Sequence, residues 1–111
     1  MPTTYKVLGQ VAPTNTSDTN LYTVPASTQT VVSTISVTND TTASATFRIY
    51  VRVNGAAASA TNTLFFDAPL AANTSAFFTV GLTLGAGDIL TVRSGTANAF
   101  TFQAFGSEVT P

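Results

Sequence analysis

Short segments in which apolar and polar residues alternate recur along the whole sequence, with turn signals between them. Alternation with a period of two is typical of β-strands that bury one side. No apolar pattern with the 3.6-residue period of a helix persists for three turns. The sequence therefore predicts about eight short strands, over residues 4–10, 21–24, 30–38, 45–53, 63–66, 76–84, 88–92 and 98–105.

Eight short strands separated by regular turns favour an all-β sandwich or barrel. The 111 residues have the length of one ordinary domain, and no linker or internal repeat divides them. We expect a single antiparallel, jelly-roll-like β-sandwich over residues 1–111. Residues 1–10 precede a long loop, so they could form an edge strand or a strand exchanged with a neighbouring copy.

The segment 46–53, with the sequence TFRIYVRV, shows the alternation most clearly. Its apolar residues fall on one side of a strand and its polar residues on the other. We expect the apolar side to face the core, and this set is Phe47, Ile49, Val51 and Val53. Their expected neighbours are Val31, Ile35, Val37, Ile89 and either Phe100 or Phe102.

The other side of the same segment carries Arg48, Tyr50 and Arg52. The whole chain has only four Lys and Arg residues, so two of them are concentrated here. One interpretation is a solvated outer face whose arginines protect a sheet edge from aggregation. The other is an interface, because Tyr and Arg are enriched where binding energy concentrates. We expect an interface in which the guanidiniums bind acidic side chains of a partner, for example Glu108 of a second copy.

Two pairs of adjacent phenylalanines, Phe65–Phe66 and Phe77–Phe78, break the alternation. One member of each pair should face the core, and the other should then face outward or into a partner. Alternatively, loops cover both sheets or the strand bulges at these positions. Exposed large apolar side chains tend to mark contact sites, so these four residues join the predicted interface.

The sequence holds few residues that could carry out catalysis. Histidine, cysteine and tryptophan are absent, which removes most general bases, nucleophile pairs and zinc sites. Asp18, Asp40 and Asp67 lie in candidate turns, and Asp88 opens a strand, as is typical of structural aspartates. The segment 15–20, NTSDTN, has one acid and no glycine, unlike a calcium loop. We expect no catalytic, cofactor or metal site, and hence no enzyme.

The charge of the chain argues against two further classes of partner. Charged residues make up 8% of the sequence and the net charge is −1. Binding to nucleic acid, or to an anionic membrane surface, needs several basic residues on one face. The apolar runs are also too short to cross a bilayer, and the first residues show no export signal.

Several segments are similar to those of a known group of proteins. The segments YKVLGQ, LYTVPA, TVVSTISVTN, TFRIYVRVNG, GLTLGAGDILTV and FTFQAFGSEVT resemble, in this order, segments of small all-β virion proteins of tailed bacteriophages. The match covers nearly the whole chain, and FRIYVRV and GAGD are its best-matched pieces. These motifs are structural, so no catalytic residue carries over.

The resemblance implies a protein that is made in the host cytoplasm and becomes part of the virion. Members of the group are head decoration, or cement, proteins or small head- and tail-associated proteins. The expected partners are the major capsid protein or other virion subunits, together with further copies of the chain in a trimer. An alternative is a small tail, neck or fibre module that binds another tail protein or a host glycan.

Overall fold

The computed structural model describes residues 2–111 and consists of eight strands in two four-stranded sheets. The strands are β1 (Thr3–Val11), β2 (Thr19–Thr23), β3 (Gln29–Asn39), β4 (Ala45–Arg52), β5 (Thr63–Leu70), β6 (Ser75–Leu84), β7 (Ile89–Ser94) and β8 (Phe100–Val109). Two short 3-10 turns, η1 (Val53–Gly55) and η2 (Ala60–Asn62), lie between β4 and β5. All strand pairs are antiparallel.

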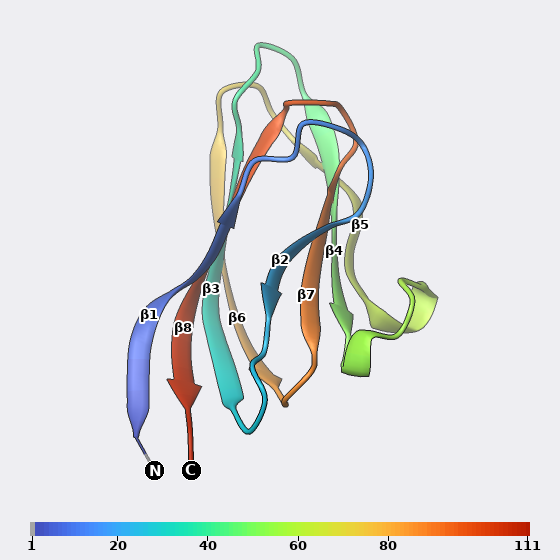
Figure 1. Cartoon of the computed structure of the whole chain (residues 1–111). Helices are drawn as coiled ribbons and strands as arrows, with labels where there is room; N and C mark the ends of the chain where they lie inside the picture. Colours follow the sequence, from blue (N-terminus) through green and yellow to red (C-terminus); the bar gives the residue numbers. More distant parts are fainter. Residues whose placement is uncertain (1) are drawn as a thin grey trace.

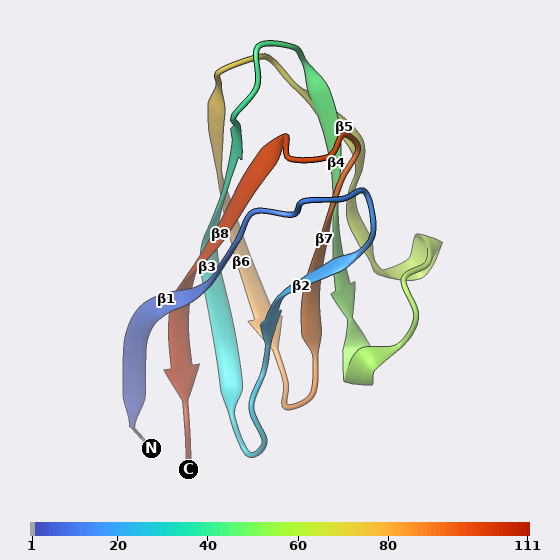
Figure 2. The same ribbon diagram turned by 45° about the horizontal axis from the view of Figure 1, so that its top comes forward.

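The strand order identifies the architecture. One sheet has the order β1-β8-β3-β6 and the other the order β2-β7-β4-β5, so the chain changes sheet at every connection except β4–β5. This is the double-sheet arrangement of a jelly roll. Figure 1 shows the two sheets facing each other, and the turned view in Figure 2 keeps them in separate layers. The prediction of an all-β, jelly-roll-like sandwich is confirmed.

A cluster of aromatic rings holds the two sheets together. Phe47 is almost fully buried, and its ring centroid lies 5.6 Å from that of Phe100 and 6.2 Å from that of Phe102. Phe65 and Phe78 lie 5.7 and 6.1 Å from Phe47, so both sheets contribute rings. Ile35, Val37, Ile49, Phe47, Phe100 and Phe102 are buried as predicted.

Three predicted core residues lie outside the core. Ile89 pairs with Arg52 across β7 and β4, so it points to the outer side of that sheet. The other two are Val53 and Val31. Val53 is 58% exposed because β4 ends at Arg52 and the chain turns into η1. Val31 is exposed because the register of β3 shifts between Val32 and Thr34. This bulge at Ser33 puts Val32 in the core in its place, while Ile35 and Val37 keep their predicted orientation.

Two strands continue well past their predicted ends. β5 continues past Phe66 to Leu70, and β8 continues past Phe105 to Val109. Asp67, expected in a turn, therefore lies within β5, where it adopts a positive φ of 51° at a bulge. β1 lies at the edge of its sheet and pairs with β8 of the same chain. Exchange of residues 1–10 between copies stays a prediction, and Met1 lies outside the described residues.

Candidate functional site

The outer face of the sheet β2-β7-β4-β5 carries three of the four basic residues of the chain, Arg48, Arg52 and Arg93. We call it the charged face. Arg48 on β4 pairs directly with Arg93 on β7 in the antiparallel register. Like charges at opposite positions of two strands destabilise a sheet, so each guanidinium requires compensation.

A bulge in β5 supplies the compensation for Arg48. The register shifts between the Phe47 and Ile49 pairings, so both Phe66 and Asp67 lie next to Arg48. The Arg48 Nε and Nη2 atoms donate hydrogen bonds of 2.7 and 3.2 Å to the two carboxylate oxygens of Asp67. The guanidinium also lies 4.0 Å above the ring of Phe66. The hydrogen bonds from Arg48 lower the pKa of the Asp67 carboxyl, and those with Asp67 raise the pKa of Arg48.

The other two arginines bind backbone carbonyls. Arg52 donates to the carbonyl oxygens of Ala56 at 2.8 Å and Gly55 at 3.1 Å, and so fixes the start of the β4–β5 connection. Arg93 Nε donates to the Thr16 carbonyl at 2.7 Å. Its Nη1 atom lies 3.8 Å from the Asp18 carboxylate, which is an ion pair but is too long for a hydrogen bond.

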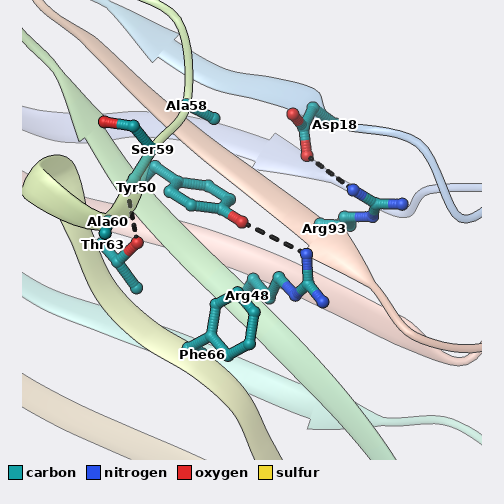
Figure 3. Close-up of a pocket in the computed structure, with 9 residues that line it drawn as sticks. All are labelled: Asp18, Arg48, Tyr50, Ala58, Ser59, Ala60, Thr63, Phe66 and Arg93. Carbon is teal, nitrogen blue, oxygen red and sulfur yellow. Dashed lines mark hydrogen bonds and ion pairs between the residues drawn. The ribbon is translucent and has the colours of Figure 1, made fainter.

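A pocket of about 580 Å³ lies on the charged face, beside Arg48 and Arg93 (Figure 3). Its lining is Asp18, Arg48, Tyr50, Ala58, Ser59, Ala60, Thr63, Phe66 and Arg93. The β4–β5 connection forms one wall. In this connection Ser59 immediately precedes η2 and forms a capping box with Asn62. Tyr50 is only 4% exposed, and its hydroxyl meets Arg48 Nη1 at 3.5 Å.

The outer face of the sheet β1-β8-β3-β6 differs completely from the charged face. Lys6 and Glu108, the only charged residues in its strands, bond to each other on the inner side. We call this outer surface the uncharged face. It exposes several large apolar side chains among Thr, Ser and Gln residues: Tyr5 (84%), Val7, Val31 and Phe77 (70%).

Glu108 belongs to a polar cluster between the sheets. The Tyr22 hydroxyl from β2 bonds to the Glu108 carboxylate and lies 2.8 Å from the Thr30 hydroxyl. Lys6 donates to the same carboxylate at 3.2 Å. The bond from Tyr22 lowers the pKa of Glu108, and burial raises the pKa of Tyr22 to about 12. Glu108, expected to bind arginines of a second copy, is thus bonded within its own chain.

The structure separates the predicted interface residues. Phe65 and Phe78 face the core with ring centroids 4.7 Å apart, so the prediction that one phenylalanine of each pair faces inward is confirmed. Phe66 (60% exposed) lies on the charged face and Phe77 on the uncharged face. Arg48, Tyr50 and Arg52 share one side of β4. Tyr50, predicted to take part in an interface, is covered by the pocket wall and leaves only 4% of its surface exposed.

Sequence reasoning missed two members of the charged face. Arg93 is not among the predicted site residues, because the predicted strand ends at Val92. One more step of alternation, from Ile89 through Thr91, would have placed Arg93 on the outer side. Asp18 was assigned to a turn without a partner. The aspartate in the GAGD turn has its expected structural role, since Asp88 accepts hydrogen bonds from Gly85 N and Asn54 N.

Comparisons with known proteins found only a weak structural similarity. No family model matches the chain, and no curated protein matches it. Among solved structures, it is similar to a chain in the structure of infectious bursal disease virus, Gx strain, with 12% identity and a TM-score of 0.45. The likeness covers 96% of this chain and 30% of the virus chain. So weak a likeness carries no functional information.

Between residues 2 and 111, no three acidic side chains gather as they would around a metal ion. No helix in this part of the chain is long and apolar enough to cross a membrane.

Proposed function

We propose that the chain is a structural subunit of a virion. More specifically, it is a capsid decoration protein of a tailed bacteriophage that binds the outer shell and stabilises neighbouring major capsid subunits. The resemblance of its segments to phage virion proteins supports this proposal. The jelly-roll topology is compatible with it, although viral capsid proteins, lectins and cupins all use this fold, so the topology alone leaves function open.

The uncharged face is the observation that carries the proposal. Contiguous apolar patches on a protein surface mark contact sites. Tyr5 and Val31 both pair with Ser107, so they lie together with Val7 on a face whose strands place no charge outward. Phe77 is mostly exposed on the same face, on the opposite edge strand β6. A contact through this face buries apolar area and meets only one carboxylate, that of Asp40, which accepts a hydrogen bond from Thr101 on β8, so it should tolerate salt well.

The proposed mechanism is mass action. A protein that binds only the assembled shell stabilises that shell by its own binding free energy. Copies that bridge neighbouring capsid subunits gain avidity, because each contact raises the effective concentration of the next. Trimers of the chain suit the local three-fold positions of an icosahedral lattice. This role requires no chemistry, and we propose that the chain is not an enzyme.

A contact through Arg48, Tyr50 and Arg52 stays a prediction. Tyr50 is covered, so such a contact would use Phe66 and the outer edges of the two guanidiniums. Because Arg48 already binds Asp67 and Arg52 already binds two carbonyls, a partner gains less from them than from unbonded arginines. We therefore assign the capsid contact to the uncharged face.

The test uses two phenylalanines that are similarly exposed on opposite faces. Particles lacking the protein are incubated with purified wild type, Phe77→Ser or Phe66→Ser, and occupancy is measured by gel densitometry at low and high salt. We expect Phe77→Ser to bind at least about tenfold more weakly, a loss of about 1.4 kcal/mol, and Phe66→Ser to bind as wild type. Equal occupancy of Phe77→Ser and wild type would refute the assignment of this face.

The alternative is a tail, neck or fibre module that binds another tail protein or a host glycan, and the pocket on the charged face favours it. Counting copies per particle separates the two functions. Hundreds of copies support a shell protein, whereas a few dozen or fewer support a tail component. Sedimentation of the purified protein tests the trimer.

A further inference from the structure

The pocket on the charged face holds hydrogen-bond donors that the protein itself does not use. Both Nη atoms of Arg93 lack a hydrogen-bond acceptor among residues 2–111, and the nearest acid, Asp18, is 3.8 Å away. Arg48 Nη1 has only the long contact of 3.5 Å with the Tyr50 hydroxyl. In that contact Tyr50 accepts, so its own hydroxyl hydrogen also has no acceptor in the described chain.

These donors converge in one place. Arg48 and Arg93 are directly paired across β4 and β7, and Tyr50 follows Arg48 on the same side of β4. Figure 3 shows the Tyr50 hydroxyl and both guanidiniums around the same hollow, with Asp18 next to Arg93. Tyr50 is nine-tenths buried, so the unused capacity of its hydroxyl is directed into the pocket and not into open solvent.

We propose that this pocket binds a saccharide that carries a carboxylate group. A carboxylate accepts several hydrogen bonds at once and matches the planar fork of arginine. Bound between Arg48 and Arg93, it would relieve the repulsion of two like charges at opposite positions. Asp67 already compensates Arg48, so the bound carboxylate would mainly compensate Arg93, whose only ion pair in the described chain is the one of 3.8 Å with Asp18.

The rest of the lining favours a sugar ring over an acidic peptide side chain. Asp18 is an acceptor that the hydroxyls of a sugar can satisfy, whereas the side chain of an acidic peptide, being a carboxylate alone, offers it no donor. Ala58, Ala60 and the exposed ring of Phe66 provide apolar surface for the C–H face of a ring. A few placed polar groups within an otherwise apolar lining are typical of small-ligand sites.

The pocket is large enough for a monosaccharide, and the size of such a ligand limits the expected affinity. A volume of about 580 Å³ lies within the usual range for small-ligand pockets. A monosaccharide acid with about 13 non-hydrogen atoms is expected to bind with a Kd of about 1 mM. The inference is independent of the proposed capsid contact, which uses the opposite face of the molecule.

The experiment measures binding to the purified, full chain by ligand-observed NMR. The probes are glucuronic acid, glucose as its neutral counterpart, and N-acetyl aspartate amide as an acidic peptide. We expect glucuronic acid to bind at millimolar concentration and the other two to bind at least about tenfold more weakly. Equal binding of all three, binding of none, or stronger binding of the acidic peptide would overturn the proposal.

Matched variants locate the site. Arg93→Ala and Lys6→Ala each remove one positive charge, but Lys6 lies on the other sheet. We expect Arg93→Ala to weaken glucuronic acid binding at least about tenfold, Lys6→Ala to leave it unchanged, and Arg93→Lys, which keeps the charge without the fork, to fall between them. If Lys6→Ala has the same effect as Arg93→Ala, the attraction is only to net charge. Arg93→Lys keeps the test valid if Arg93→Ala melts early.

Discussion

The sheet β2-β7-β4-β5 places three of the four basic residues on its outer face, whereas the sheet β1-β8-β3-β6 places no charged residue on its outer face. The inner faces are alike, since both contribute phenylalanines and branched aliphatic residues to one core. Packing therefore constrains one side of each strand, and the alternate positions are free to differ. We propose different partners for the two faces, an apolar protein surface on one side and a small acidic ligand on the other.

The contribution of the core to stability should not depend on the difference between the two outer faces, and Phe47→Ala tests this expectation. Its ring contacts rings from both sheets, so truncation should lower the free energy of unfolding by about 3–5 kcal/mol. Chemical denaturation measures the loss. A loss below about 1 kcal/mol, the scale of surface substitutions, would mean that β4 is turned over and the faces are misassigned.

The polar cluster at Tyr22 should matter less than the core but more than either outer face. Tyr22→Phe removes the bonds from its hydroxyl to Glu108 and Thr30, and we expect a loss of about 1–2 kcal/mol at pH 7. Urea denaturation of the variant and of wild type gives the difference. No loss would show that water replaces the hydroxyl without cost.

The pH dependence of stability should follow the same cluster. The folded protein lowers the pKa of Glu108 below its ordinary 4.5, so this contribution is present above pH 4.5 and is lost as the pH falls through the folded pKa. The pKa of Tyr22 is raised from 10 to about 12, so its contribution is present below pH 10 and is lost as the pH rises to about 12. In Tyr22→Phe the alkaline loss should disappear and the acid loss should shrink.

The two sides of β7 can be compared through two hydroxyl groups, one on the inner side and one on the outer side. Ser94 Oγ is buried without a hydrogen-bond partner among the described residues, whereas Thr91 Oγ1 bonds to Asn20 and Arg52. We expect Ser94→Ala to be neutral or to stabilise by up to about 1 kcal/mol, and Thr91→Val to destabilise by about 1 kcal/mol. Thermal unfolding of the two variants measures both. Destabilisation by Ser94→Ala would indicate that an ordered water satisfies the serine.

The smallest effects on stability should come from the two outer phenylalanines. Phe66→Ser and Phe77→Ser should each change the free energy of unfolding by no more than about 0.5 kcal/mol, because both rings are mostly exposed. Chemical denaturation again provides the measurement. If a variant binds particles more weakly but unfolds as wild type does, the substitution has removed a contact with the particle. A large destabilisation of Phe66→Ser alone would mean that its stacking with Arg48 supports the charged face.

Alternation along the sequence predicted the strands and most of the core. It did not predict the bulges, after which the other set of alternate residues faces the core. Val31 and Val32 are equally good core residues, and only the bulge at Ser33 decides between them. The end of β8 has the sequence GSEV, which looks like a polar tail. It is a strand because β1 and β3 flank it on both sides, so pairing overrides the weak strand propensity of its residues.

The candidate site was only half visible in the sequence. Arg48, Tyr50 and Arg52 share a side because they lie on one strand, which local spacing shows. The pairing of Arg48 with Arg93 depends on the register between β4 and β7, across about forty residues of chain, and no local pattern encodes that register. The cover over Tyr50 depends on how the β4–β5 connection folds, which its small residues do not specify.

The position of β8 has a consequence for how the protein is made. β8 lies between β1 and β3, with Val109 opposite Thr3, so the first and last strands of the sandwich are neighbours. Chains emerge from the ribosome from the N-terminus onward, and β1 and β3 must wait with open edges until β8 appears. Folding of this sheet therefore waits for β8, the last strand of the sandwich to be synthesised, which fills the gap beside the first.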